Sequence, residues 1–146
     1  ILTRSDDNSI CEIDAETIRE KKVSDVKERV KIGNNSSADV FVSIHLNKIS
    51  ESQYSGWQTF YKNSDEDSKK LATSIQNSLN STISNNYDRI PHTISNVYIM
   101  KNVEIPITIV ECGFLSNKDD EARLKTDEYQ QELAWGIYNG IMDYFE

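Results

Sequence analysis

Two short apolar segments, each carrying one polar and chemically capable side chain, constrain the fold of this chain more than any other feature. Residues 40–47 include His45, and residues 107–114 include Glu111. Nearly continuous apolar runs of this length are typical of strands that are buried on both faces of a sheet. Because rigid strand ends often present functional groups to clefts, His45 and Glu111 are candidates for a metal ligand and a general base.

Predicted helices alternate with predicted strands along the chain. Helical spacing of apolar residues predicts a helix over residues 16–32 with Asp14 as its N-cap, a second from an N-cap at Ser64 through Ile83, and a third over residues 127–145. The predicted strands cover residues 1–3, 39–45, 56–61, 97–100 and 107–111, and residues 85–95 are expected to form a polar loop. This alternation predicts an α/β three-layer sandwich, with a mostly parallel or mixed sheet and helices on both faces.

Length and charge narrow the classes of protein to which the chain can belong. Its 146 residues fit one domain, 1–146, with a single core. The net charge of −8 argues against non-specific binding to nucleic acids or anionic membranes, which requires clustered Lys and Arg. No apolar run approaches the roughly 18 residues of a membrane-spanning helix. Of the two cysteines, Cys112 lies in an apolar run, which favours a buried free thiol over a disulfide with Cys11.

His45 allows two interpretations. It is either hydrogen-bonded at the edge of the core or a ligand to a divalent transition metal, held by the strand behind it. Asn47 points to the same side of an extended chain and is a candidate for binding ligand or substrate. His92 lies in the predicted loop after Pro91 and is expected to be an ordinary surface residue. Arg89 either contacts an anionic substrate or caps the preceding helix.

Glu111 is less easily assigned to a structural role, because its neighbours in the sequence are apolar. Burying an unpaired carboxylate is costly, so either an Arg or a backbone N–H pairs with it, or its pKa rises towards that of a general base at neutral pH. Gly113 allows the backbone to turn just after this carboxylate. Trp57 and Tyr61 either line a sugar-binding face or, as is commoner for aromatics at strand spacing, belong to the core.

The order and spacing of several motifs resemble one known family, the zinc-dependent N-acetylmuramoyl-L-alanine amidases of bacterial cell walls (amidase type 3). The most specific are Ser43-Ile44-His45-Leu46-Asn47 and Val110-Glu111-Cys112-Gly113-Phe114-Leu115-Ser116-Asn117. Shorter matches are Leu2-Thr3-Arg4 with Asp7, Arg29 with Asn34, Ser55-Gly56, Phe60-Tyr61, Arg89, Ile105-Pro106 and Gly136-Ile137. Residues 96–106 are most similar to the sporulation amidases of the CwlD type, which act in spore-cortex maturation.

The resemblance implies a hydrolase that cleaves the amide between N-acetylmuramic acid and the L-alanine of the stem peptide. It implies that Zn²⁺ is held by two His and one Glu, and that a second Glu takes a proton from the activated water. His45 matches one zinc-binding His, and Glu111 matches the catalytic Glu. The family's other His and its ligand Glu precede the segment that Leu2-Thr3-Arg4 matches, so we expect these ligands, and the family's first strand, to lie upstream of Ile1. Residues 1–146 alone are then expected to bind zinc poorly and to be inactive.

The resemblance also implies peptidoglycan as the binding partner, a secreted or cell-envelope location such as the forespore intermembrane space, and an activating or anchoring protein partner. Two other functions stay open. One is a catalytically silent module of the same fold that binds the cell wall or another protein. The other is a different zinc hydrolase of similar fold, such as a carboxypeptidase, and product analysis for free L-alanine amino termini would distinguish the two hydrolases.

Overall fold

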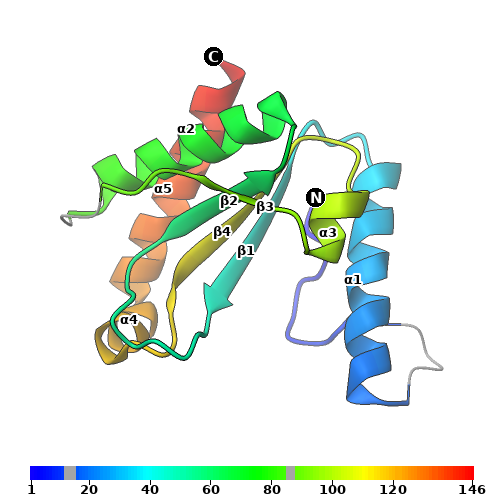
Figure 1. The fold of residues 1–146 in the computed structure, drawn as a ribbon, viewed down its shortest axis with the longest axis horizontal. Helices are drawn as coiled ribbons and strands as arrows, with labels where there is room; N and C mark the ends of the chain where they lie inside the picture. The colour runs from blue at the N-terminus through cyan, green and yellow to red at the C-terminus, as the bar shows by residue number, and fades with distance from the viewer. Residues whose placement is uncertain (12–15, 85–87) are drawn as a thin grey trace.

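A mixed β-sheet forms the middle layer of the structure, a computed structural model that describes residues 1–11, 16–84 and 88–146 (Figure 1). Across the described residues the strand order is β1 (Phe41–Asn47), β4 (Ile107–Phe114), β2 (Gln58–Lys62) and β3 (His92–Ile94). β1 and β4 run parallel, β2 is antiparallel to β4, and β3 is parallel to β2. The predicted α/β sandwich with helices on both faces of a mixed sheet is therefore confirmed.

One face of the sheet is covered by α2 (Glu66–Thr82) and α5 (Asp127–Phe145), and α4 (Lys118–Leu124) lies beside the start of α5 (Figure 1). The larger core lies between these helices and the sheet, where Cys112 is a buried free thiol, as predicted. Trp57 is fully buried in this core, so its ring is not a surface platform. The main members of the core are Trp57, Leu71, Ile75, Leu79, Val110, Cys112, Leu133 and Ile137.

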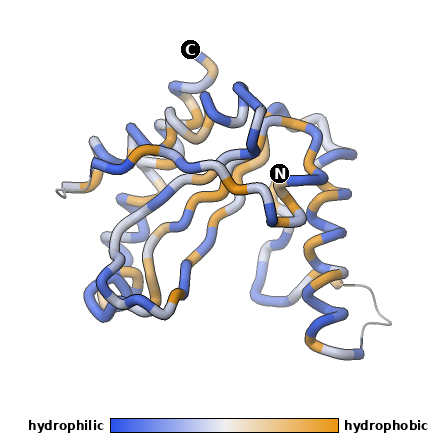
Figure 2. The backbone as a smooth tube through the Cα atoms, in the orientation of Figure 1, coloured by the Kyte–Doolittle hydropathy of each residue, from blue (hydrophilic) through white to orange (hydrophobic). Residues whose placement is uncertain are grey.

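The opposite face is covered by α1 (Ile18–Asn35) and the short α3 (Tyr98–Asn102). A second and smaller core lies between these helices and the sheet. Its buried members are Val30, Ile99, Met100, Val103, Ile107 and Ile109. β4 contributes to both cores, and Figure 2 shows apolar residues concentrated along it. Among the described residues, no helix is both long enough and apolar enough to cross a membrane.

The helix boundaries follow from local capping. Thr17 caps α1 in a capping box, in which its side chain accepts from the Glu20 amide and Glu20 accepts from the Thr17 amide. The predicted cap Asp14 lies outside the described residues. At α2 the cap is Asp65, whose carboxylate accepts from the Ser68 amide at 2.9 Å, whereas the predicted cap Ser64 adopts a φ of 59°. The bounds of α5 are those predicted.

Three local predictions were wrong. Residues 97–100, expected to form a strand, supply the N-cap Val97 and the start of the helix α3, whose turn buries Ile99 and Met100 against β4 and α1. The expected loop 85–95, of which residues 85–87 lie outside the described part of the chain, contains β3, which pairs with β2 through the register of Phe60 with His92. Residues 1–3 form no strand with the described part of the chain. Short apolar runs do not distinguish a strand from a helix turn, so tertiary contacts decide these segments.

The close packing of α5 on α2 yields a testable prediction, because it depends on glycine. A Cβ at Gly140 would overlap the backbone of Ile75, and a Cβ at Gly136 would lie 2.8 Å from the more adaptable Leu79 side chain. Gly140→Ala should therefore lower the free energy of unfolding by about 1–3 kcal/mol, despite the better helix propensity of Ala. Gly136→Ala should cost less, and the exposed Gln131→Ala should stay within about 0.5 kcal/mol of the wild type in urea unfolding. Equal stability of the wild type and Gly140→Ala would contradict this packing.

Candidate functional site

His45 and Glu111 meet at the carboxyl ends of the two parallel strands. β1 pairs with β4 in a register that places His45 opposite Glu111, and an irregularity in the pairing follows between His45 and Asn47. Because side chains alternate along a strand, register partners point to the same face of the sheet. This is the face covered by α1, since Phe41, two residues before Ser43 and four before His45, packs into the smaller core. The structure thus brings together the two groups that the sequence singled out.

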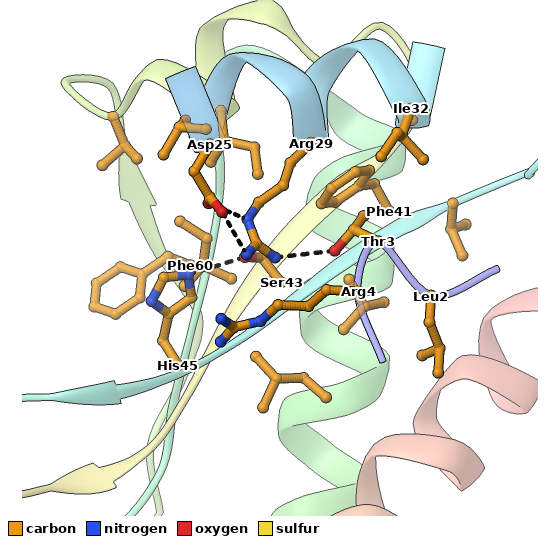
Figure 3. Close-up of a pocket in the computed structure, with 18 of the residues that line it drawn as sticks. Leu2, Thr3, Arg4, Asp25, Arg29, Ile32, Phe41, Ser43, His45 and Phe60 are labelled. Carbon is orange, nitrogen blue, oxygen red and sulfur yellow. Dashed lines mark hydrogen bonds and ion pairs between the residues drawn. The ribbon is translucent and has the colours of Figure 1, made fainter. Parts of the chain in front are cut away.

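Both groups line an open cavity of about 1100 Å³ between the sheet, α1 and the N-terminal residues (Figure 3). Its floor is formed by β1 and β4, and Phe60 and Ile94 extend it towards β2 and β3. Asn47 lies on the wall at the same end as His45 and Glu111. This volume is slightly above the range of about 300–1,000 Å³ that is usual for small-molecule sites, so the cavity has room for a ligand of at least that size.

The imidazole of His45 is held by the strand that carries it. Its Nε2 lies 3.0 Å from the Ser43 hydroxyl, which projects from the same face of β1 (Figure 3). Burial of the ring lowers the pKa of His45, and the nearby cations Arg29 and Lys22 lower it further. The ring is therefore neutral at pH 7, and neutral imidazole is the form that binds metals and accepts protons.

Glu111 is poorly solvated, and no described residue forms an ion pair with it. Its Oε2 is buried and has no hydrogen-bond partner among the described residues. Gln58, its register partner on β2, uses both amide hydrogens on the carbonyls of Thr59 and Ile90. Desolvation raises the pKa of Glu111 to about 7. The predicted alternative, in which an Arg or a backbone N–H neutralises this carboxylate, is therefore not what the described residues form.

The described residues alone do not fit a zinc ion. A catalytic zinc site needs three protein ligands and one open position, and no group of three or more His, Cys, Asp or Glu in residues 1–11, 16–84 and 88–146 is placed to hold a metal. His92 lies two strands from β4, with its ring 6.5 Å from that of Phe60. Within the described residues His45 therefore remains a single candidate ligand, and Glu111 remains a candidate base.

Arg89 and Asn47 lie at the same end of the sheet. The Arg89 guanidinium donates to the Ser55 carbonyl and lies 5.6 Å over the Phe114 ring, so it links Arg89 to the segment before β2 and to the end of β4. The Asn47 carbonyl accepts from the Leu115 amide at 2.7 Å. Direct contact of either side chain with a substrate stays a prediction.

Asp120 is a residue whose role the sequence did not reveal. It is fully buried, and one carboxylate oxygen accepts from the Gly56 amide at 2.8 Å and from the Phe114 amide at 2.9 Å, while the other pairs with Arg123 at 2.7 Å. Asp120 therefore ties the segment before β2 to the end of β4, three residues beyond Glu111. An acid in the first turn of a helix is usually solvated, so its position in the sequence gave no signal of this role.

Comparisons with known proteins agree with this geometry. A family model described as N-acetylmuramoyl-L-alanine amidase matches residues 1–143. The germination-specific N-acetylmuramoyl-L-alanine amidase of Bacillus subtilis is 36% identical over 145 residues, which cover 99% of this chain and 61% of that protein. The chain thus spans about three fifths of this curated relative.

Two solved structures share the fold over nearly the whole chain. The CwlD amidase of Clostridioides difficile, solved in complex with the GerS lipoprotein, has a TM-score of 0.94 at 40% identity, covering 99% of this chain and 74% of that one. The catalytic domain of CwlV from Bacillus (Paenibacillus) polymyxa has a TM-score of 0.80 at 32% identity, covering 99% and 71%. The motifs, the fold and these similarities show that the chain belongs to the N-acetylmuramoyl-L-alanine amidase family and resembles amidases of the CwlD type.

Proposed function

We propose that the protein containing this chain hydrolyses the amide between N-acetylmuramic acid and the L-alanine of the peptidoglycan stem peptide. The observation that carries the proposal is Glu111, a half-buried carboxylate that has no counter-ion among the described residues and lines an open cavity beside a neutral His45. A general base works best when its pKa lies near the working pH, and burial gives Glu111 that property. Family membership supplies the bond that is cleaved.

In this proposal Glu111 takes a proton from the attacking water and delivers it to the nitrogen of the leaving L-alanine. Its Oε2 has no hydrogen-bond partner among the described residues, so this atom is available to accept that proton. β4 holds the backbone of Glu111 in place because it pairs with β1 on one edge and with β2 on the other. Asp120 holds the end of the same strand by accepting a hydrogen bond from the Phe114 amide. Proton transfer of this kind typically contributes a factor of 10² to 10⁴ to the rate.

We further propose that the parent protein requires Zn²⁺, with His45 as one ligand and the remaining His and Glu supplied from outside the described residues. Zinc would lower the pKa of a water and polarise the amide carbonyl. The proposal is supported by three observations: the neutral His45, the open cavity beside it, and the greater length of the relatives. β1 also lies at the edge of the sheet, and its Ile44 and Leu46 are 63% and 49% exposed. This edge leaves room for the additional strand that the family resemblance implies.

The cellular role proposed here is maturation of the spore cortex, in the cell envelope or the forespore intermembrane space. It rests on likeness to a germination-specific amidase and to the CwlD amidase. Because that CwlD amidase was solved with a lipoprotein, we propose that a protein partner activates or anchors this protein as well.

A silent peptidoglycan-binding module of the same fold is the second candidate function, favoured by the incomplete ligand set of the described residues. Release of L-alanine amino termini from purified peptidoglycan distinguishes the two.

Glu111→Gln should reduce hydrolysis of peptidoglycan by the parent protein at least about 10²-fold, because the amide cannot accept the proton. The measurement is the rate at which new L-alanine amino termini appear. Zinc content should stay near that of the wild type, since Glu111 is not proposed as a ligand. The exposed Glu104→Gln is the matched control and should keep the wild-type rate. A Glu111→Gln protein with near-normal turnover would disprove the role of the base.

The same substitution should change how stability depends on pH. The folded-state pKa of Glu111 is about 7, against 4.5 for an unperturbed Glu, so folding favours the protonated form. The wild type should therefore lose stability relative to Glu111→Gln as the pH rises from about 4.5 to 7, with no further loss above that range. Urea unfolding of both proteins at pH 5 and pH 8 tests this. A stability difference that is the same at both values would contradict the raised pKa.

His45→Ala in the parent protein should abolish stoichiometric zinc binding, because only two of three ligands would remain. Elemental analysis after dialysis measures the zinc content directly. His92→Ala serves as the control, since this histidine lies two strands away from Glu111, and it should keep the metal. Unchanged zinc in His45→Ala would remove His45 from the ligand set.

A further inference from the structure

The cavity wall that faces His45 is basic, in contrast to the chain as a whole. The chain carries a net charge of −8, yet the lining of the cavity includes the cations Arg4, Lys22 and Arg29 from the N-terminal segment and α1. Among the described lining residues the acids are Asp25 and Glu111. A basic cleft on an acidic protein concentrates anions at one place and repels them elsewhere.

The three cations are not equivalent. Arg29 is committed to the protein: its guanidinium pairs with Asp25 at 2.6 Å and donates to the Thr3 hydroxyl at 2.9 Å (Figure 3). Asp25 also accepts from the Ile10 amide at 2.9 Å, so its charge is satisfied by groups of the fold. Arg29 and Asp25 together therefore build the wall and add little net charge to it.

Arg4 and Lys22 are in a different position. Both side chains are exposed, and neither lies within 4 Å of an acidic group of the described residues. In Figure 3 the Arg4 side chain extends along β1 towards His45. Lys22 lines the same cavity as His45 and Arg4. The acids Asp6 and Asp25 lie close enough to Arg4 to feel its charge, but among the described residues neither cation is held in a salt bridge.

We propose that Arg4 and Lys22 bind a carboxylate of the stem peptide while the scissile amide lies between His45 and Glu111. This inference rests on the proposed amidase function and deepens it by naming the part of the substrate that is recognised. A guanidinium and an ammonium that line one cavity suit a carboxylate, which the guanidinium can bind with two parallel hydrogen bonds. The contact orders the peptide on the α1 side of the cleft and leaves the amide at the ends of β1 and β4.

A pair of synthetic substrates tests the proposal in the full-length parent protein. One is an N-acetylmuramoyl-L-alanyl peptide whose acidic residues carry free carboxylates, and the other is the same peptide with those groups converted to carboxamides. Both are measured for binding by calorimetry, in the Glu111→Gln background, and for kcat and KM with Glu111 intact. The variants are Lys22→Met, the charge-preserving Lys22→Arg, and the control Lys21→Met, which removes an exposed neighbouring charge that does not line the cavity.

The wild type should bind the carboxylate peptide about three- to tenfold more tightly than the carboxamide, with similar kcat for both. Lys22→Met should lose most of this preference through KM, Lys22→Arg should keep it, and Lys21→Met should match the wild type. Equal binding of the two peptides by the wild type would overturn the inference, as would an equal loss for both peptides in Lys22→Met. A charge-dependent preference without any hydrolysis by the wild type would support this inference and overturn the amidase function instead.

Discussion

The parallel pairing of β1 with β4 is the interaction on which the rest of the site depends. It sets His45 opposite Glu111, and a slip of one residue would turn one of them to the face covered by α2 and α5. The pairing is secured from both sides of the sheet, because residues of β4 alternate between two cores. The position of His45 opposite Glu111 therefore depends on the burial of β4.

Much of this arrangement could be predicted from the sequence. The two apolar runs identified β1 and β4, and the polar residue within each identified the candidate site. The helix α5 was predicted with its observed bounds because its apolar residues recur at helical spacing over nineteen residues. Segments that are long and strongly patterned carry their own structural information, and the fold class followed from their alternation.

The parts that could not be predicted depend on contacts between distant segments. α3 is a helix because Ile99 and Met100 pack against the smaller core, and β3 exists because β2 offers it an edge. Asp120 links the segment before β2 to the end of β4 because it accepts from the amides of Gly56 and Phe114, which are distant from each other in the sequence. The cavity wall depends on Arg29 reaching Thr3, which lies 26 residues away in the sequence. None of these long-range contacts can be predicted from local residue spacing or secondary-structure propensity.

The position of β1 at the end of the sheet order has a consequence for handling the protein. Its outer edge carries backbone N–H and C=O groups without a neighbouring strand among the described residues, and Ile44 and Leu46 beside it are exposed. Natural proteins blunt such edges with charges, proline or a covering element, because an open apolar edge is a template for pairing between copies. Residues 1–146 in isolation are accordingly prone to self-association through β1, at a rate set by protein concentration and reduced by any segment that covers that edge.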